Sequence, residues 1–218
     1  MPFAARHRDD PTSPLPPLPG LAVRRERDPR AMAALQGRSE EEMTRRFDDG
    51  HRAYVALIDE RQAAWGWVAT RAAAIGELGA TFAIPRGERY LWNFVTLASH
   101  RGLGIYPRLL DAIVRAESSD AERFWIAYAP ENHASGAGIR KAGFVALAEL
   151  SFDAAGRPAV DGMVPGGAAV AAHVLALPMA TAALAQCWRC VRAGRPGMSC
   201  APGACRCDYQ RPESGCAA

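Results

Sequence analysis

The chain has 218 residues, of which 49% are hydrophobic and 22% are charged, as is typical of a globular protein with one domain and short appendages. The net charge of +3 is unevenly placed, because five arginines from Cys187 onward outnumber Asp208 and Glu213, while residues 1–20 and 21–186 are each neutral overall. A neutral body argues against binding to an extended phosphate backbone, so no nucleic-acid partner is expected.

The first twenty residues contain prolines at positions 2, 11, 14, 16, 17 and 19 and lack a long apolar run. This composition predicts a disordered or polyproline leader over residues 1–20 and argues against a signal peptide. We therefore expect a folded domain over residues 21–180, and a cytoplasmic protein.

From Leu21 onward, apolar residues recur at strand and helix spacing. Asp28-Pro29 indicates a helix start with proline at the first position, and Ser39-Glu-Glu-Glu42 is a capping box that opens a second short helix. The expected order is β-α-α-β-β-β-α-β-α-β, which is typical of an α/β (α+β) fold. The predicted strands cover residues 21–26, 51–58, 63–71, 90–97, 124–128 and 144–152; helices begin at residues 28, 39, 104 and 132; and residues 72–86 are assigned to further strand and loop.

A glycine-containing turn lies between the predicted strand 90–97 and the helix that starts at Gly104. Its sequence is Arg101-Gly-Leu-Gly-Ile-Tyr-Pro107. Glycines let the backbone approach a ligand, and the unpaired N–H groups of the first helical turn direct the positive end of the helix dipole toward it. The turn therefore predicts a site for phosphate.

A second motif follows the strand 124–128: Asn132, then Ser135, then Gly143-Phe144. Only two asparagines occur in the chain, so one at this position is informative. Together with Arg101-x-x-Gly104-x-Tyr106, this arrangement resembles the GNAT (GCN5-related) family of acetyl-CoA-dependent N-acyltransferases. The resemblance covers roughly residues 21–153. It implies a mixed, mainly antiparallel central sheet flanked by helices.

The resemblance also implies roles for individual residues. The end of the strand would pair its backbone with the pantetheine arm of coenzyme A, the glycine turn would hold the pyrophosphate, Asn132 would bond the pantetheine region, and Ser135 would start the second helix. An alternative for Asn132 is a simple helix cap, which is compatible with that role. The expected coenzyme A residues are Phe94, Val95, Thr96, Arg101, Gly102, Leu103, Gly104, Ile105, Tyr106, Pro107, Asn132 and Ser135.

The candidate catalytic groups depart from the pattern of the family that the chain resembles. Many family members carry a tyrosine four residues after the motif serine, as the acid for the departing thiolate, but this chain has Ile139 there. Tyr106 or Tyr128 is the expected substitute, or the thiolate leaves with help from solvent. Glu88 shares one strand face with Tyr90 and Trp92 and is the candidate general base; it is equally consistent with an exposed charge in a turn.

Two segments near the end of the chain need separate interpretation. Residues 168–185 are mostly apolar, but His173 and Pro178 interrupt them, so we expect a last strand over His173 to Leu177 and then a helix, not a membrane span. Residues 181–218 hold all six cysteines. Four of them suit a zinc site, and a thiol-rich disordered tail fits the spacing equally well. The four candidate ligands are Cys187, Cys190, Cys200 and Cys205.

The sequence thus predicts an N-acetyltransferase that moves an acetyl or short acyl group from acetyl-CoA to a primary amine of a small molecule or protein. The alternative is a non-catalytic regulatory module that binds acyl-CoA and contacts a partner through its cysteine-rich tail. Neither the acceptor nor the oligomeric state is indicated.

Overall fold

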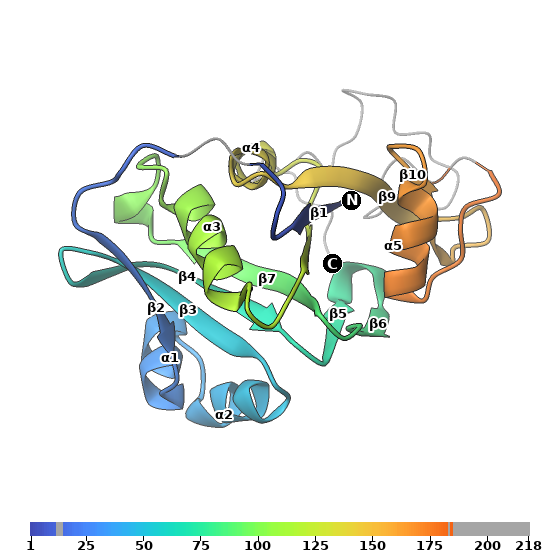
Figure 1. The fold of residues 1–218 in the computed structure, drawn as a ribbon. Coiled ribbons are helices and arrows are strands. Elements are labelled where there is room, and N and C mark those ends of the chain that lie inside the picture. The colour runs from blue at the N-terminus through green and yellow to red at the C-terminus, as the bar shows by residue number, and fades with distance from the viewer. Residues whose placement is uncertain (12–14, 183, 185–218) are drawn as a thin grey trace, which may run out of the picture.

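The computed structural model describes residues 1–11, 15–182 and 184. Its centre is an eight-stranded sheet in the order β10-β9-β1-β8-β7-β4-β3-β2, with helices on both faces (Figure 1). Every neighbouring pair in this sheet is antiparallel except β7 with β8. The mixed, mainly antiparallel sheet flanked by helices confirms the expected fold class.

The elements follow the predicted order with additions at both ends. The strands of the large sheet are β1 (Pro2–His7), β2 (Leu21–Glu26), β3 (Arg52–Ile58), β4 (Arg61–Ala69), β7 (Glu88–Thr96), β8 (Arg123–Ala127), β9 (Val145–Phe152) and β10 (Pro158–Gly162). A separate hairpin of β5 (Ala72–Ile75) and β6 (Ala80–Ala83) fills the segment assigned to further strand and loop. The helices are α1 (Pro29–Gln36), α2 (Glu40–Asp48), α3 (Ile105–Glu117), α4 (His133–Lys141) and α5 (Gly167–Leu175), with short 3-10 turns at Gly76–Leu78 and Ala98–His100.

The first two helices begin where the sequence indicates. The Asp28 side chain accepts a hydrogen bond from the Arg30 backbone N–H, with Pro29 at the first helical position. The Ser39 hydroxyl accepts from the Glu42 backbone N–H at 3.2 Å, which is half of the predicted capping box. Local chemistry alone therefore sets both helix starts.

Strand β4 separates the two layers of the core. Trp65 and Trp67 point to one face, where they pack with α1 and α2, while Ala64 and Val68 point to the other face and pack with α3. Figure 1 shows α3 and the α1–α2 pair on opposite sides of this part of the sheet. The alternation of side chains along one strand thus assigns each helix to its face.

The expectation of a disordered leader is wrong for residues 2–7, which form β1 in the interior of the sheet between β8 and β9. Phe3 is fully buried and stacks on Trp125 with ring centroids 4.9 Å apart. Arg6 is also buried, and its guanidinium donates to Asp111 and to the carbonyl of Ala142. The many prolines of residues 1–20 led to the expectation of disorder, although a short apolar run is present among them. Pro2 is tolerated because it is the first residue of the strand.

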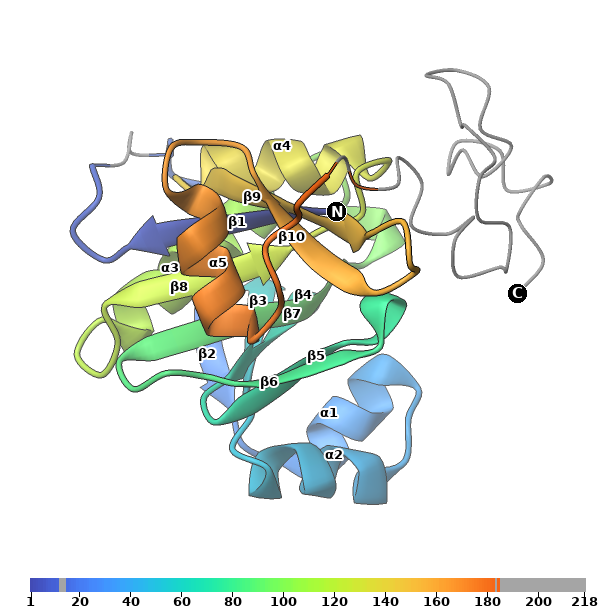
Figure 2. The same ribbon diagram turned by 90° about the vertical axis from the view of Figure 1, so that its right-hand side faces the viewer.

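The predicted last strand over His173 to Leu177 is also wrong. Residues up to Leu175 belong to α5, which lies beside β9 and β10 (Figure 2). The strand that follows β9 is β10, and it adds to the outer edge of β9 because β1 occupies the inner side. Among the described residues, no helix has the length and apolar character needed to cross a membrane.

Replacement of Phe3 by alanine tests whether β1 belongs to the folded sheet. Loss of a fully buried phenylalanine is expected to lower the free energy of unfolding by about 3–5 kcal/mol, as measured by urea denaturation. Val145→Ala on the neighbouring strand β9 is the control, because Val145 is 54% exposed and its loss should change stability by less than about 0.5 kcal/mol. Equal effects of the two substitutions would contradict the position of β1.

Candidate functional site

A β-bulge in β7 shapes the site. Trp67 pairs with Trp92 and Trp65 pairs with Val95, so the single residue Gly66 lies opposite two residues, Asn93 and Phe94. Asn93 adopts a left-handed conformation with φ of 52°, which asparagine tolerates better than most residues. The extra residue reverses the alternation, so the Phe94 side chain joins the core under α3 and α4 while Val95 packs on the opposite face.

Gly66 accommodates this bulge. A Cβ atom at Gly66 would lie 2.0 Å from the Phe94 ring, so only glycine allows the ring to lie over β4 at this point. β7 stops pairing with β8 just before the bulge, where the last parallel pair joins Leu91 to Ile126. The two strands therefore diverge toward the end of β7.

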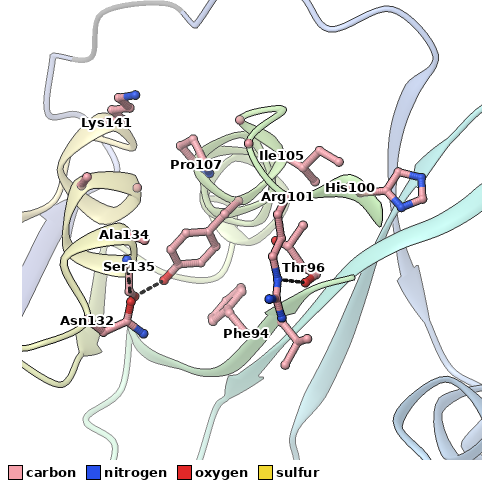
Figure 3. Close-up of a pocket in the computed structure, with 16 residues that line it drawn as sticks. Phe94, Thr96, His100, Arg101, Ile105, Pro107, Asn132, Ala134, Ser135 and Lys141 are labelled. Atoms are coloured by element: carbon pink, nitrogen blue, oxygen red, sulfur yellow. Dashed lines mark hydrogen bonds between the residues drawn. The ribbon is translucent and has the colours of Figure 1, made fainter. Parts of the chain in front are cut away.

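A pocket of about 610 Å³ lies where the strands diverge, between the end of β7, the first turn of α3 and one side of α4 (Figure 3). It brings together every expected coenzyme A residue except Leu103, whose side chain is exposed. The pocket also includes residues that the sequence did not single out. Its full lining is Phe94, Val95, Thr96, His100, Arg101, Gly102, Gly104, Ile105, Tyr106, Pro107, Asn132, Ala134, Ser135, Ala137, Gly138 and Lys141.

The turn before α3 presents backbone rather than side chains to the pocket. Gly102 and Gly104 have φ values of 81° and 69°, in the left-handed region that favours glycine. Gly104 is the N-cap of α3 and provides no side-chain cap, so the amino end of the helix dipole is directed at the pocket. Arg108 fixes the turn by donating to the Gly104 carbonyl at 2.7 Å and to the Pro16 carbonyl.

The second motif places another helix start at the same pocket. Asn132 is the N-cap of α4, and its side-chain oxygen accepts from the Ser135 backbone N–H at 3.0 Å. The capping role of Asn132 is therefore present in the structure, and the residue also lines the pocket. Two helix amino ends thus meet at one cavity, and both favour an anionic or strongly polar ligand there.

Tyr106 occupies the space between α3 and α4. Its ring packs on Phe94 with centroids 5.5 Å apart, and its hydroxyl lies 3.4 Å from the Ser135 hydroxyl. A Cβ atom at Gly138 would lie 2.5 Å from the ring, so the glycine in the middle of α4 makes room for the tyrosine. Burial raises the pKa of Tyr106 to about 12, so the phenol stays protonated at neutral pH.

The structure does not bring Glu88 to the pocket, and its assignment as general base is wrong for this arrangement. Glu88 begins β7, eight residues before Thr96, which places it roughly 25 Å away along the strand. Its carboxylate accepts from the Trp125 indole N–H at 2.5 Å. Glu88 shares its strand face with Tyr90, as the alternation predicts, but Phe94 packs on the opposite face with α3 and α4, and Glu88 lies at the far end of the strand.

Neither the residue at the usual acid position, Ile139, nor the candidate substitute Tyr128 lines the pocket. Ile139 is buried in the core under α3 and α4, and Tyr128 packs over Gly136 without lining the pocket. Of the two tyrosines considered, the pocket therefore contains only Tyr106. Among the described residues that line it, none is an aspartate or glutamate.

The zinc prediction lies outside the described residues, because Cys187, Cys190, Cys200 and Cys205 all belong to the segment after residue 184. Within the described ranges, no group of three or more His, Cys, Asp or Glu side chains is arranged to hold a metal ion. Zinc binding by the tail stays a prediction.

No protein-family model matches the sequence, and no curated protein sequence matches it. Similar solved structures include a GNAT-family acetyltransferase from Streptococcus pneumoniae (16% identity over 60% of this chain and 88% of that one, TM-score 0.45). A second is a GNAT-family acetyltransferase from Colwellia psychrerythraea (15% identity over 66% of this chain and 52% of that one, TM-score 0.46). A third is the aminoglycoside N-acetyltransferase AAC(6')-Iy in complex with CoA (15% identity over 57% of this chain and 91% of that one, TM-score 0.43). At these identities and TM-scores the likenesses do not carry an activity, which has to rest on the pocket.

Gly138→Ala tests the fit between Tyr106 and α4. Alanine normally stabilises a helix interior by about 1 kcal/mol relative to glycine, but here the added Cβ forces the Tyr106 ring to move. We expect Gly138→Ala to lower the free energy of unfolding in the native background and to raise it by about 1 kcal/mol in a Tyr106→Ala background, measured by urea denaturation as a double-mutant cycle. Equal stabilisation in both backgrounds would contradict the contact.

Proposed function

We propose that the protein transfers an acetyl or short acyl group from a coenzyme A thioester to a primary amine of a small molecule or protein. The observation that carries this proposal is the pocket itself, where the free edge of β7 and the amino ends of α3 and α4 meet at the point where β7 leaves β8. These features together suit one elongated ligand that carries both amide groups and phosphates.

The chemistry of the lining supports the binding of coenzyme A. The pyrophosphate is held by backbone N–H groups of the turn Gly102–Tyr106 at the amino end of α3; Pro107 has no N–H to contribute. The pantetheine amides pair with the backbone of Phe94, Val95 and Thr96, because that edge of β7 has lost β8 as its neighbour. The arm extends past Asn132, and the thioester lies beside the bulge.

The reaction forms an N–C bond and breaks the C–S bond. The neutral amine attacks the thioester carbonyl, the intermediate collapses, the amine proton passes to water, and the thiolate leaves. A phenol with a pKa of about 12 is a weaker acid than a thiol, so Tyr106 donates a hydrogen bond to the departing sulfur, and solvent supplies the proton. The long 3.4 Å separation from the Ser135 hydroxyl leaves this hydrogen bond available.

The alternative is a module that binds acyl-CoA without turnover. The lack of a carboxylate among the described pocket residues favours it, as does the buried isoleucine at position 139. Release of free thiol from acetyl-CoA, measured with a panel of amines, separates the two functions. Acceptor-dependent release supports the enzyme, and tight binding without any release supports the module.

Gly104→Val tests the phosphate site at α3. Valine at a φ of 69° strains the turn and moves it away from a bound pyrophosphate, so coenzyme A affinity should fall by at least tenfold in isothermal titration calorimetry. Gly87→Val is the matched control, because Gly87 also has a positive φ, of 80°, but lies outside the pocket. Equal affinity of the two variants would rule out the site.

Tyr106→Phe tests the role of the phenol. Loss of one hydrogen bond to a developing thiolate should lower kcat by about 10- to 100-fold while the affinity for coenzyme A stays within about twofold. Tyr128→Phe is the control, since this tyrosine does not line the pocket, and should retain full kcat. If kcat falls in the control and not in Tyr106→Phe, the assignment is wrong.

A further inference from the structure

Lys141 is the single lysine among 26 basic residues, and it lines the pocket at the carboxyl end of α4. In Figure 3 it lies at the far end of α4 from Asn132, while Phe94 lies on the strand below. Within the described residues, no hydrogen bond or ion pair engages its ammonium group. The pocket therefore has a cation at the end opposite the one that would hold the thioester.

Two other arginines, on α3 and β1, are already engaged. The Arg108 guanidinium donates to the Pro16 and Gly104 carbonyls. The Arg6 guanidinium donates to the Ala142 carbonyl at 2.8 Å and to Asp111 at 3.0 Å. Through these contacts the buried Arg6 side chain joins the end of α4 to the second turn of α3, and so holds Lys141 beside the pocket.

The carboxyl end of α4 would otherwise repel an anion. A helix carries partial negative charge at its carboxyl end, which favours cations and disfavours phosphate. The last turn contains Arg140 and Lys141, but only Lys141 lines the pocket; the Arg140 side chain lies toward Gly136. An anion at this end of the pocket therefore depends on Lys141.

We propose that Lys141 binds the 3′-phosphate of coenzyme A and makes the pocket discriminate against dephospho-coenzyme A. This inference rests on the proposed function. With the pyrophosphate at the amino end of α3 and the pantetheine arm running toward Phe94, the nucleoside extends the other way, toward Lys141. An ammonium group is a compact donor that suits a phosphate dianion.

The test compares the affinities for coenzyme A and dephospho-coenzyme A by isothermal titration calorimetry at low ionic strength. The native protein should bind coenzyme A about 5-fold more tightly, the size expected for one solvent-exposed charge pair. Lys141→Met should lose this preference by weakening coenzyme A alone, with the affinity for dephospho-coenzyme A unchanged. Arg140→Met removes the same charge beside the pocket and should keep the native ratio.

Two other outcomes overturn the inference. If Lys141→Met keeps the native ratio of affinities, or if Arg140→Met loses it equally, Lys141 does not bind the 3′-phosphate. Where Lys141→Met keeps the ratio by weakening both ligands equally, Lys141 contacts the pyrophosphate instead. In each of these cases the native protein still binds coenzyme A, so the proposed function stands. If the native protein binds neither ligand, the proposed function fails and this inference fails with it.

Discussion

The pocket depends on one extra residue in β7. The bulge at Asn93 reverses the alternation of side chains, turns Phe94 toward α3 and α4, and lies just beyond the point where β7 stops pairing with β8. The last parallel pair of β7 and β8 is Leu91 with Ile126, so the backbone of β7 beyond it faces the pocket on that side. The left-handed φ at Asn93 and the absent side chain at Gly66 are the two local features that permit the bulge.

The bulky residue in the glycine-containing turn before α3 is accommodated by a small residue elsewhere in the chain. A bulky tyrosine at position 106 requires space, and Gly138 on the neighbouring helix provides it. The same reasoning applies to Tyr128, because a Cβ atom at Gly136 would lie 2.8 Å from its ring. Two glycines inside a nine-residue helix weaken it by about 1 kcal/mol each, so α4 relies on its cap and on these ring contacts.

Most of the fold and the residues that line the pocket could be predicted from the sequence, because turns, caps and alternation are local. The sequence did not reveal β1, since the partners of that strand lie more than a hundred residues away and only tertiary pairing distinguishes a short apolar run from a leader. Glu88 was misplaced for a similar reason: alternation gives the face of a strand but not which end meets the site. Asn93 could have been found, because an asparagine inside a strand pattern indicates a bulge or a turn.

Amide hydrogen exchange with and without coenzyme A tests the central claim most directly. Binding at the divergence of β7 from β8 should slow exchange at the backbone N–H groups of residues 94–96 and 102–106, while the β5–β6 hairpin on the opposite face stays unchanged. Protection confined to other elements, or no protection at residues 94–96 and 102–106 at saturating coenzyme A, would contradict the account.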